Sequence, residues 1–188
     1  MNTQAFLENI LPFKLSESQS SVLQKMEDFD RILITGKRQT GVTTLLVLDL
    51  ARLILSNNPG KYLFVCKNFH LHNNILNLVK LFFSDDSLKI DASGSINLPD
   101  GSKILLMTDR QLKVNTRGHT FDGIYVDDCL HLTNLAAICV LRHSKKQVFG
   151  CTSDNAYTNE LIDIKSTILN YRDSLPAILH LDFSPLIG

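Results

Sequence analysis

Residues 32–46 read Ile32-Leu33-Ile34-Thr35-Gly36-Lys37-Arg38-Gln39-Thr40-Gly41-Val42-Thr43-Thr44-Leu45-Leu46. The stretch begins as an apolar run rich in β-branched residues and passes through a loop that one glycine opens and another closes. After the second glycine the chain becomes leucine-rich, with the spacing of a helix. This pattern predicts a strand, a tight loop and a helix in direct succession.

The loop glycines, Gly36 and Gly41, have the spacing of the phosphate-binding motif G-x-x-x-x-G-K-[ST]. In that motif the backbone N–H groups of the loop wrap the phosphates of a nucleotide, and the positive end of the helix points at them. Thr43 supplies a hydroxyl where the motif has its Mg²⁺ ligand, but Val42 stands where the motif has lysine. Lys37 can bring an ammonium group to the phosphates from the other side of the loop. The alternative is an ordinary strand-to-helix turn, or a loop that has lost its lysine and binds nothing.

A second informative stretch is Phe121-Asp122-Gly123-Ile124-Tyr125-Val126-Asp127-Asp128. Residues 123–126 predict a buried strand, and two carboxylates follow at its carboxyl end. There a phosphate-loop NTPase places the aspartate that holds Mg²⁺ and, beside it, the carboxylate that orients or deprotonates the attacking water. We therefore assign Asp127 to the metal and Asp128 to the water, with a plain turn as the alternative. Since Asp128 is shorter than the usual glutamate, the water must sit about one carbon closer.

Strand and helix patterns alternate along most of the chain, which predicts an α/β fold with a mostly parallel central sheet and helices on both faces. Residues 1–29 predict two helical segments separated by Pro12, with Ser16 or Ser18 capping the second. Residues 87–107 predict an inserted antiparallel hairpin, because short apolar pieces flank the turn at 99–102. The remaining predicted elements are helices over 43–55, 71–83, 130–141 and 161–169 and strands over 61–66, 147–151 and 177–183.

The strand predicted over 147–151 ends in two small hydroxyl residues, Thr152 and Ser153. Beside a γ-phosphate, such residues can sense whether that phosphate is present and couple hydrolysis to movement. The alternative is that they cap the following helix together with Asp154 or Asn155.

The composition of the chain fits one domain over 1–188, large enough for a full core. Lys+Arg and Asp+Glu are balanced at 19 each, so any contact with nucleic acid must be local. No apolar stretch approaches the roughly 20 residues of a membrane helix, and we expect a soluble intracellular protein. The four cysteines lack a C-x-x-C pair, which favours buried reduced thiols over a metal site or disulfides.

With these motifs in place, the chain over roughly residues 10–182 resembles the ATPase domain of the bacteriophage-type viral large terminase, the motor that pumps DNA into procapsids. Residues 37–45 are close to that family's R-Q-x-G-x-[ST]-T form, and some members lack the lysine after the second glycine. Residues 116–122 match the segment that leads into the aspartate strand. Residues 98–104 are similar to its hairpin and residues 151–155 to its coupling motif.

The resemblance implies a RecA-like P-loop NTPase that hydrolyses ATP with Mg²⁺. It implies that Gln19 reads the adenine edge, with a surface glutamine as the alternative. Catalysis is assigned to Asp128, Lys37 and Arg38, with Arg38 on the phosphates or acting as an arginine finger. Arg117 and Arg142 are further arginine-finger candidates, and a surface salt bridge is the alternative for each. Thr43 and Asp127 are assigned as metal ligands, and Thr152 and Ser153 are assigned to the coupling of hydrolysis to movement. The residues assigned to nucleotide binding are Gln19, Gly36, Lys37, Arg38, Gln39, Thr40, Gly41, Val42, Thr43 and Thr44.

The resemblance also implies partners: double-stranded DNA, a portal, a small terminase subunit and further copies of this chain in a ring, in the host cytoplasm. This sequence has no room for the RNase H-like nuclease domain that normally follows. If it is the whole protein, we expect a separate chain to do the cutting, or no cutting at all. Two other hypotheses stay open. One is a degenerate P-loop module that binds nucleotide or a partner without hydrolysis, and the other is one lobe of a helicase-type ATPase.

Overall fold

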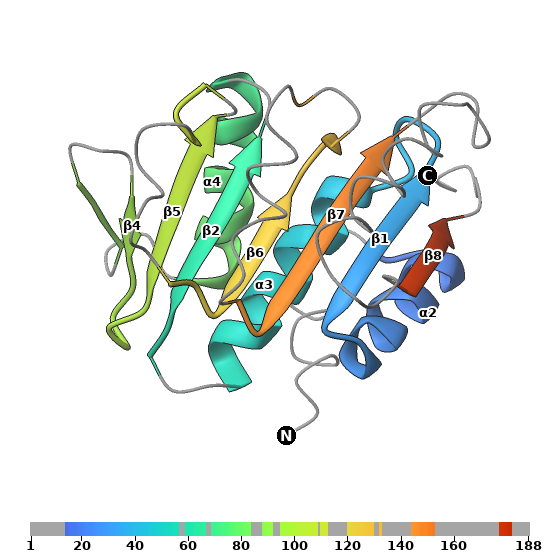
Figure 1. Ribbon diagram of the computed structural model, residues 1–188, viewed down its shortest axis with the longest axis horizontal. Coiled ribbons are helices and arrows are strands. Elements are labelled where there is room, and N and C mark those ends of the chain that lie inside the picture. Colours follow the sequence, from blue (N-terminus) through green and yellow to red (C-terminus); the bar gives the residue numbers. More distant parts are fainter. Residues whose placement is uncertain are drawn as a thin grey trace.

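The computed structural model describes residues 14–56, 59–66, 69–83, 88–91, 95–108, 110–112, 120–129, 132, 144–152 and 177–181, with the backbone alone for residues 69–72 and 74. An eight-stranded sheet forms the centre of this described part (Figure 1). Its strands in chain order are β1 Arg31–Gly36, β2 Lys61–Cys66, β3 Lys89–Ile90, β4 Ile96–Asn97, β5 Lys103–Thr108, β6 Gly123–Val126, β7 Lys146–Thr152 and β8 Ala177–Leu181. The helices are α2 Glu17–Lys25, α3 Val42–Ser56 and α4 Phe69–Phe82, with a short 3-10 turn, η1, over Met26–Asp28.

The sheet has the order β3-β4-β5-β2-β6-β7-β1-β8. The pairs from β5 across to β8 are all parallel, whereas β3–β4 and β4–β5 are antiparallel. The prediction of a mostly parallel α/β sheet with an antiparallel hairpin over 87–107 is therefore confirmed. The turn between β4 and β5 needs glycine, because Gly101 has a φ of +87°.

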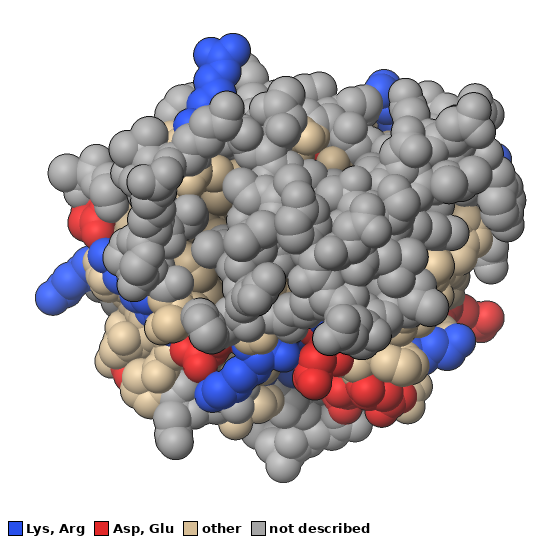
Figure 2. Space-filling view, in the orientation of Figure 1, with Lys and Arg blue, Asp and Glu red and all other residues tan. Residues whose placement is uncertain are grey.

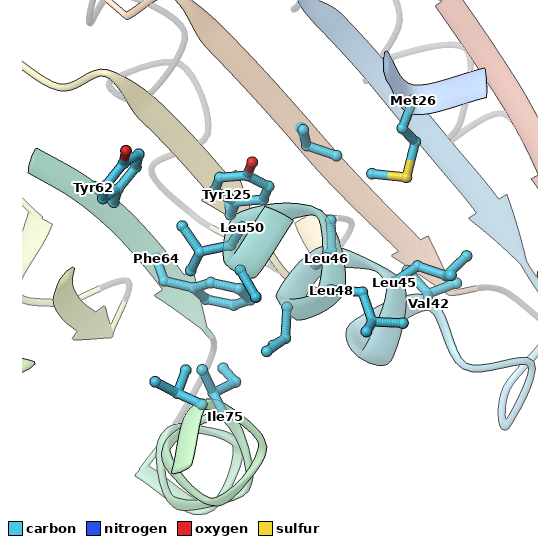
Figure 3. Close-up of a cluster of buried hydrophobic side chains, with 14 of the residues drawn as sticks. Met26, Val42, Leu45, Leu46, Leu48, Leu50, Tyr62, Phe64, Ile75 and Tyr125 are labelled. Carbon is cyan, nitrogen blue, oxygen red and sulfur yellow. The ribbon is translucent and has the colours of Figure 1, made fainter. Parts of the chain in front are cut away.

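Both faces of the central strands are buried. Alternate residues of a strand point to opposite sides of the sheet, and nearly all residues of β1, β2, β6 and β7 are hidden from water. On one face, helices α2, α3 and α4 pack against side chains such as Tyr62, Phe64 and Tyr125 (Figure 3). On the other face, Leu63, Val126 and Phe149 belong to a second buried cluster. The helices predicted over 130–141 and 161–169 lie outside the described residues, as does the first segment of 1–29.

A buried polar network ties α3 to its neighbours on the first face of the sheet. The Asp49 carboxylate in the middle of α3 accepts a hydrogen bond from Tyr125 Oη at 2.9 Å and pairs with Lys146 Nζ at 3.1 Å. It also pairs with Arg52 one turn along the helix. Lys146 Nζ donates to Met26 O at 2.7 Å, and Arg52 donates to Leu23 O at 2.9 Å. These bonds link α3, α2, η1 and the strands β6 and β7 through groups that are hidden from water.

The predicted starts of the helices agree with the structure to within two residues where the structure describes them. The helix predicted over 43–55 begins at Val42, the helix predicted over 71–83 begins at Phe69, and Ser16 caps α2, so that Ser18 lies inside the helix. Among the described helices, none combines the length and the apolarity that a bilayer crossing demands. The cysteines that the structure describes, Cys66, Cys129 and Cys151, are buried and form no disulfide.

Candidate nucleotide-binding site

The candidate site lies at the edge of the sheet where the parallel strands end (Figure 1). Strand β7 separates β1 from β6, and the register places Gly36 of β1 level with Thr152 of β7. On its other side, β7 pairs with β6 up to Val126, directly before the two aspartates. The glycine loop, the hydroxyl of Thr152 and the acidic pair therefore meet at one edge, which is where open α/β sheets bind ligands.

Thr43 and Asp127 are in direct contact at this edge. Thr43 lies in the first turn of α3, and its Oγ1 donates to the two oxygens of Asp127 at distances of 2.9 and 3.0 Å. The backbone N–H of Asp127 donates to Val65 O at 2.9 Å, so strand β2 fixes its position. Asp127 is only 2% exposed. Burial raises the pKa of Asp127 to about 6, the Thr43 hydrogen bond lowers it, and the charge of Asp128 raises it again.

The loop between β1 and α3 is tightly curled. The Thr40 hydroxyl donates back to Lys37 O at 2.7 Å, and a Cβ added to Gly36 would lie 2.5 Å from Thr40 Oγ1. Gln39 and Gly41 both have left-handed backbones, with φ of 65° and 87°. At the start of helix α3, the Leu45 N–H donates a hydrogen bond to Gly41 O. The preceding N–H groups of α3 have no partner within the helix, which makes this end suited to an anion.

Val42, at the position of the motif's lysine, is part of the core rather than of the loop surface. Its side chain is 2% exposed and belongs to the cluster under α3 (Figure 3). A Cβ added to Gly150 of β7 would lie 2.7 Å from Val42 Cγ1, so the helix and the strand approach very closely there. The positive charges of this loop are therefore those of Lys37 and Arg38, whose side chains are exposed.

Gln19 contacts the loop through its side-chain amide. Its Nε2 donates to Thr40 O at 2.8 Å, and its Oε1 accepts from the Ser16 N–H at 2.9 Å. Ser16 Oγ in turn accepts from the Gln19 N–H at 3.2 Å, which completes a capping box at the start of α2. Gln19 therefore joins α2 to the glycine loop, a contact that sequence reasoning missed. The Ser-x-x-Gln pattern places Gln19 inside the first turn, but nothing in the sequence points to Thr40.

Asp128 is held in an unusual backbone conformation beside Thr152. Its φ is 54°, which is uncommon for a residue with a side chain, and Thr152 Oγ1 donates to Asp128 Oδ1 at 3.4 Å. Next to them, the buried thiols of Cys129 and Cys151 are hydrogen-bonded to each other. This bond, together with burial, raises the pKa of Cys129 well above its ordinary value, so this thiol is expected to stay uncharged. Sequence reasoning treated these cysteines separately and missed the pair.

No family model and no curated protein sequence matches the chain. Solved structures do match. The large terminase from a thermophilic bacteriophage, in complex with ADP, is 16% identical, with a TM-score of 0.62 over 90% of this chain and 45% of that chain. The large terminase ATPase domain of Thermus phage P74-26 is 10% identical, with a TM-score of 0.53 over 77% of this chain and 68% of that chain. The Sulfolobus solfataricus SWI2/SNF2 ATPase core in complex with dsDNA is 18% identical, with a TM-score of 0.64 over 86% of this chain and 37% of that chain. The fold is that of a RecA-like P-loop NTPase.

The structural neighbours of this P-loop fold are ATPase cores of the terminase and helicase types. The chain spans less than half the length of the ADP-bound terminase chain. At such low identities the likeness shows the fold, and the activity has to be argued from the residues of the site.

The oxygen ligands offered by Thr43 and Asp127, at the end of β6, suit a magnesium ion. Among the described residues, no three His, Cys, Asp or Glu side chains gather as a metal-binding group. A P-loop magnesium ion needs fewer protein ligands, because phosphate oxygens and waters complete its octahedron. The Thr43 hydroxyl and the buried Asp127 carboxylate are hard oxygen ligands within 3.0 Å of each other. These two residues therefore fit the ion.

Most of the residues assigned from the sequence lie at this edge. The structure brings together Gln19, Gly36, Thr40, Gly41, Thr43, Asp127, Asp128 and Thr152, with Lys37, Arg38 and Gln39 exposed on the loop and Thr44 half-buried behind it. Of the residues assigned to the nucleotide, Val42 is turned into the core. Ser153, Arg117 and Arg142 lie outside the described residues.

Proposed function

We propose that this chain binds ATP with Mg²⁺ and hydrolyses it as the ATPase motor domain of a viral DNA-packaging terminase. The observation that carries the proposal is the Thr43–Asp127 contact at the end of a glycine loop, with Asp128 and Thr152 beside it. A P-loop NTPase needs this arrangement, because one hydroxyl and one carboxylate must share the metal while a second carboxylate faces the γ-phosphate.

In the proposed mechanism, Thr43 and Asp127 hold the ion, which when bound neutralises charge on the phosphate oxygens. The N–H groups at the start of α3 bind the phosphates, and Lys37 and Arg38 bring positive charge in place of the missing lysine. Asp128 orients the attacking water and accepts its proton. Thr152 donates to the Asp128 carboxylate. In this proposal Thr152 reports on the γ-phosphate together with Ser153, which lies outside the described residues.

DNA translocation into a procapsid is proposed from the likeness to large terminases and to an ATPase core bound to dsDNA. Along the lower edge in Figure 2, acidic and basic side chains lie side by side on the described surface. A ring of copies with DNA in its centre therefore has to use a few local basic loops. The same proposal includes a portal, a small terminase subunit, and Arg117 or Arg142 as an arginine finger.

The test is ATP turnover with Mg²⁺, with and without double-stranded DNA, for the natural chain and for Asp128→Asn and Lys37→Ala. We expect each substitution to lower turnover by more than about tenfold, since each removes a charge from the reacting centre. Lys25→Ala, an exposed lysine on α2, is the matched control and is expected to leave turnover unchanged. The motor proposal fails if the natural chain matches background and Asp128→Asn changes nothing.

The burial of Val42 favours a second candidate, a P-loop module that binds nucleotide or a partner without hydrolysis. This candidate predicts background turnover from every variant. Retained nucleotide binding, measured by calorimetry, would then support it. A helicase-type lobe instead predicts that turnover depends on a second domain supplied in the same assay.

A further inference from the structure

Both the nitrogen and the oxygen of the Gln19 side-chain amide form hydrogen bonds, and one of the partners is the main chain of the phosphate loop. Its Nε2 donates to Thr40 O at 2.8 Å while its Oε1 accepts from the Ser16 N–H at 2.9 Å. A Cβ added to Gly41 would lie 2.5 Å from the same Nε2. Gln19 therefore lies directly against the Thr40–Gly41 peptide, and only glycine at position 41 leaves room for it.

A hydrogen bond to the Thr40 carbonyl also fixes the direction of the next N–H group. The peptide unit is planar and trans, so its C=O and N–H point in opposite directions. With Thr40 O held toward α2, the Gly41 N–H is turned away from α2, to the other side of the loop. Loops of this kind bind phosphate through such N–H groups, and orienting them in advance lowers the cost of binding.

Helix α2 is rigid enough to hold the loop in this way. Val22 and Leu23 are buried in the core, and Arg52 of α3 donates to Leu23 O at 2.9 Å. Lys146 of β7 donates to Met26 O just beyond the end of α2, at 2.7 Å. The helix that carries Gln19 is therefore attached to the same helix and strand that carry Thr43 and Thr152.

We propose that Gln19 is a positioning residue that holds the phosphate loop in its phosphate-receiving shape, so that its effect on binding does not depend on the base of the nucleotide. This inference rests on the proposed function, because it assumes that the loop binds a triphosphate. It differs from adenine reading in one measurable respect. An adenine reader changes the affinity for ATP alone, whereas a residue that positions the loop changes the affinity for any triphosphate.

The experiment measures the dissociation constants of ATP, GTP and inorganic tripolyphosphate with Mg²⁺ by calorimetry, for the natural chain and for Gln19→Met. Methionine has a similar length but neither donates nor accepts a strong hydrogen bond. The variant loses both amide bonds, of which only the bond to Thr40 O reaches the loop. We therefore expect the affinities for all three ligands to fall by the same factor, about fivefold for the loss of this one neutral hydrogen bond. Gln24→Met makes the same change at an exposed position of α2 and is expected to leave all three constants unchanged.

Weakening of ATP alone would identify Gln19 as an adenine reader and overturn the inference, and so would unchanged affinity for all three ligands. If the natural chain binds none of the three, the proposed function itself fails and the inference falls with it. Should the methionine variant unfold, Gln19→Asn is measured in the same way, because it keeps the amide but is one carbon too short for Thr40 O. Its expected result is the same uniform loss.

Discussion

Asp127 is a carboxylate almost entirely removed from water, and the Thr43 hydroxyl donates to both of its oxygens. Burying such a group is costly unless it has hydrogen-bond donors or a cation, so a pair like this is expected where a cation is to be held. In the absence of the cation, the Thr43 hydroxyl and the backbone N–H of Asp128 stabilise the charged carboxylate.

Replacing that hydroxyl by a methyl group should therefore destabilise the protein. We expect Thr43→Val to lower the free energy of unfolding by about 1–3 kcal/mol at a pH of about 7.5, because it leaves the buried carboxylate with the Asp128 backbone N–H but without its side-chain donor. Thr43→Ser, which keeps the hydroxyl, should retain most of the stability. Urea unfolding measures both. Equal stability of the valine variant and the natural chain would show that the Thr43 hydroxyl does not stabilise the buried carboxylate.

At the residue scale, the sequence predicted which residues lie together at the site better than it predicted their hydrogen bonds. Thr43 and Asp127 follow from motif spacing, because the ends of parallel strands share one edge of a sheet. The Gln19–Thr40 bond joins residues on different elements, and no periodicity encodes it. The same applies to the Cys129–Cys151 pair, whose members are brought together only by the neighbouring ends of β6 and β7.

The approach of helix α3 to strand β7 depends on a residue without a side chain. At Gly150, a Cβ would lie 2.7 Å from Val42 Cγ1 and 2.9 Å from Leu46 Cδ1. We expect Gly150→Ala to cost about 1–3 kcal/mol, because it overpacks this contact and pushes the first turn of α3 away from the sheet. Thermal unfolding measures the loss, and weaker nucleotide binding should accompany it, since Thr43 lies on that turn.

A second substitution tests the physical reason for that loss. Val42→Ala removes the methyl groups of the nearer of the two side chains that the new Cβ would meet, so the double variant with Gly150→Ala should lose less stability than the two single variants together. Strictly additive losses would mean that Gly150 matters for something other than the distance between helix and strand.

Of two neighbouring lysines, Lys145 and Lys146, only Lys146 belongs to the buried network around Asp49 of α3. Lys146 is almost fully buried against Asp49 and Met26, whereas the side chain of Lys145 is 85% exposed. Lys146→Met should cost about 3 kcal/mol, because it leaves the Asp49 carboxylate short of a partner in the core. Lys145→Met should change stability by less than about 0.5 kcal/mol. Chemical denaturation of both variants under the same conditions measures these two losses of stability. Equal losses would contradict the role assigned to the buried network.

At the scale of elements, the sequence predicted what local patterning determines and missed what packing determines. Strand β2 was predicted over its full length, because a strand buried on both faces shows a continuous apolar run. The position of β7 between β1 and β6 follows from the assembled sheet and has no local signal. The charges of Asp49 and Arg52 within α3 were not recognised as buried, because charged residues usually mark the solvated face of a helix.

For the whole molecule, the proposed ligand should act as a stabiliser that links the loop, α3 and the sheet. A ligand that binds only the folded state at about 100 times its dissociation constant adds about 2.7 kcal/mol to the free energy of unfolding. We therefore expect ATP with Mg²⁺ to raise the unfolding temperature, and removal of Mg²⁺ with EDTA to abolish most of the rise. AMP, which lacks the β- and γ-phosphates, is the control. An equal shift with AMP would contradict the proposed role of the loop.

The strand that leads into the loop has both of its hydrogen-bonded neighbours late in the chain. Strand β1 pairs with β7 on one side and with β8 on the other, at residues 146–152 and 177–181. During synthesis on the ribosome, both edges of β1 therefore stay unpaired at first, and the second edge is paired only when residues 177–181 have emerged. We expect nascent chains halted before residue 146 to need chaperone protection, and the proposed nucleotide binding to arise only after residue 181 has left the ribosome.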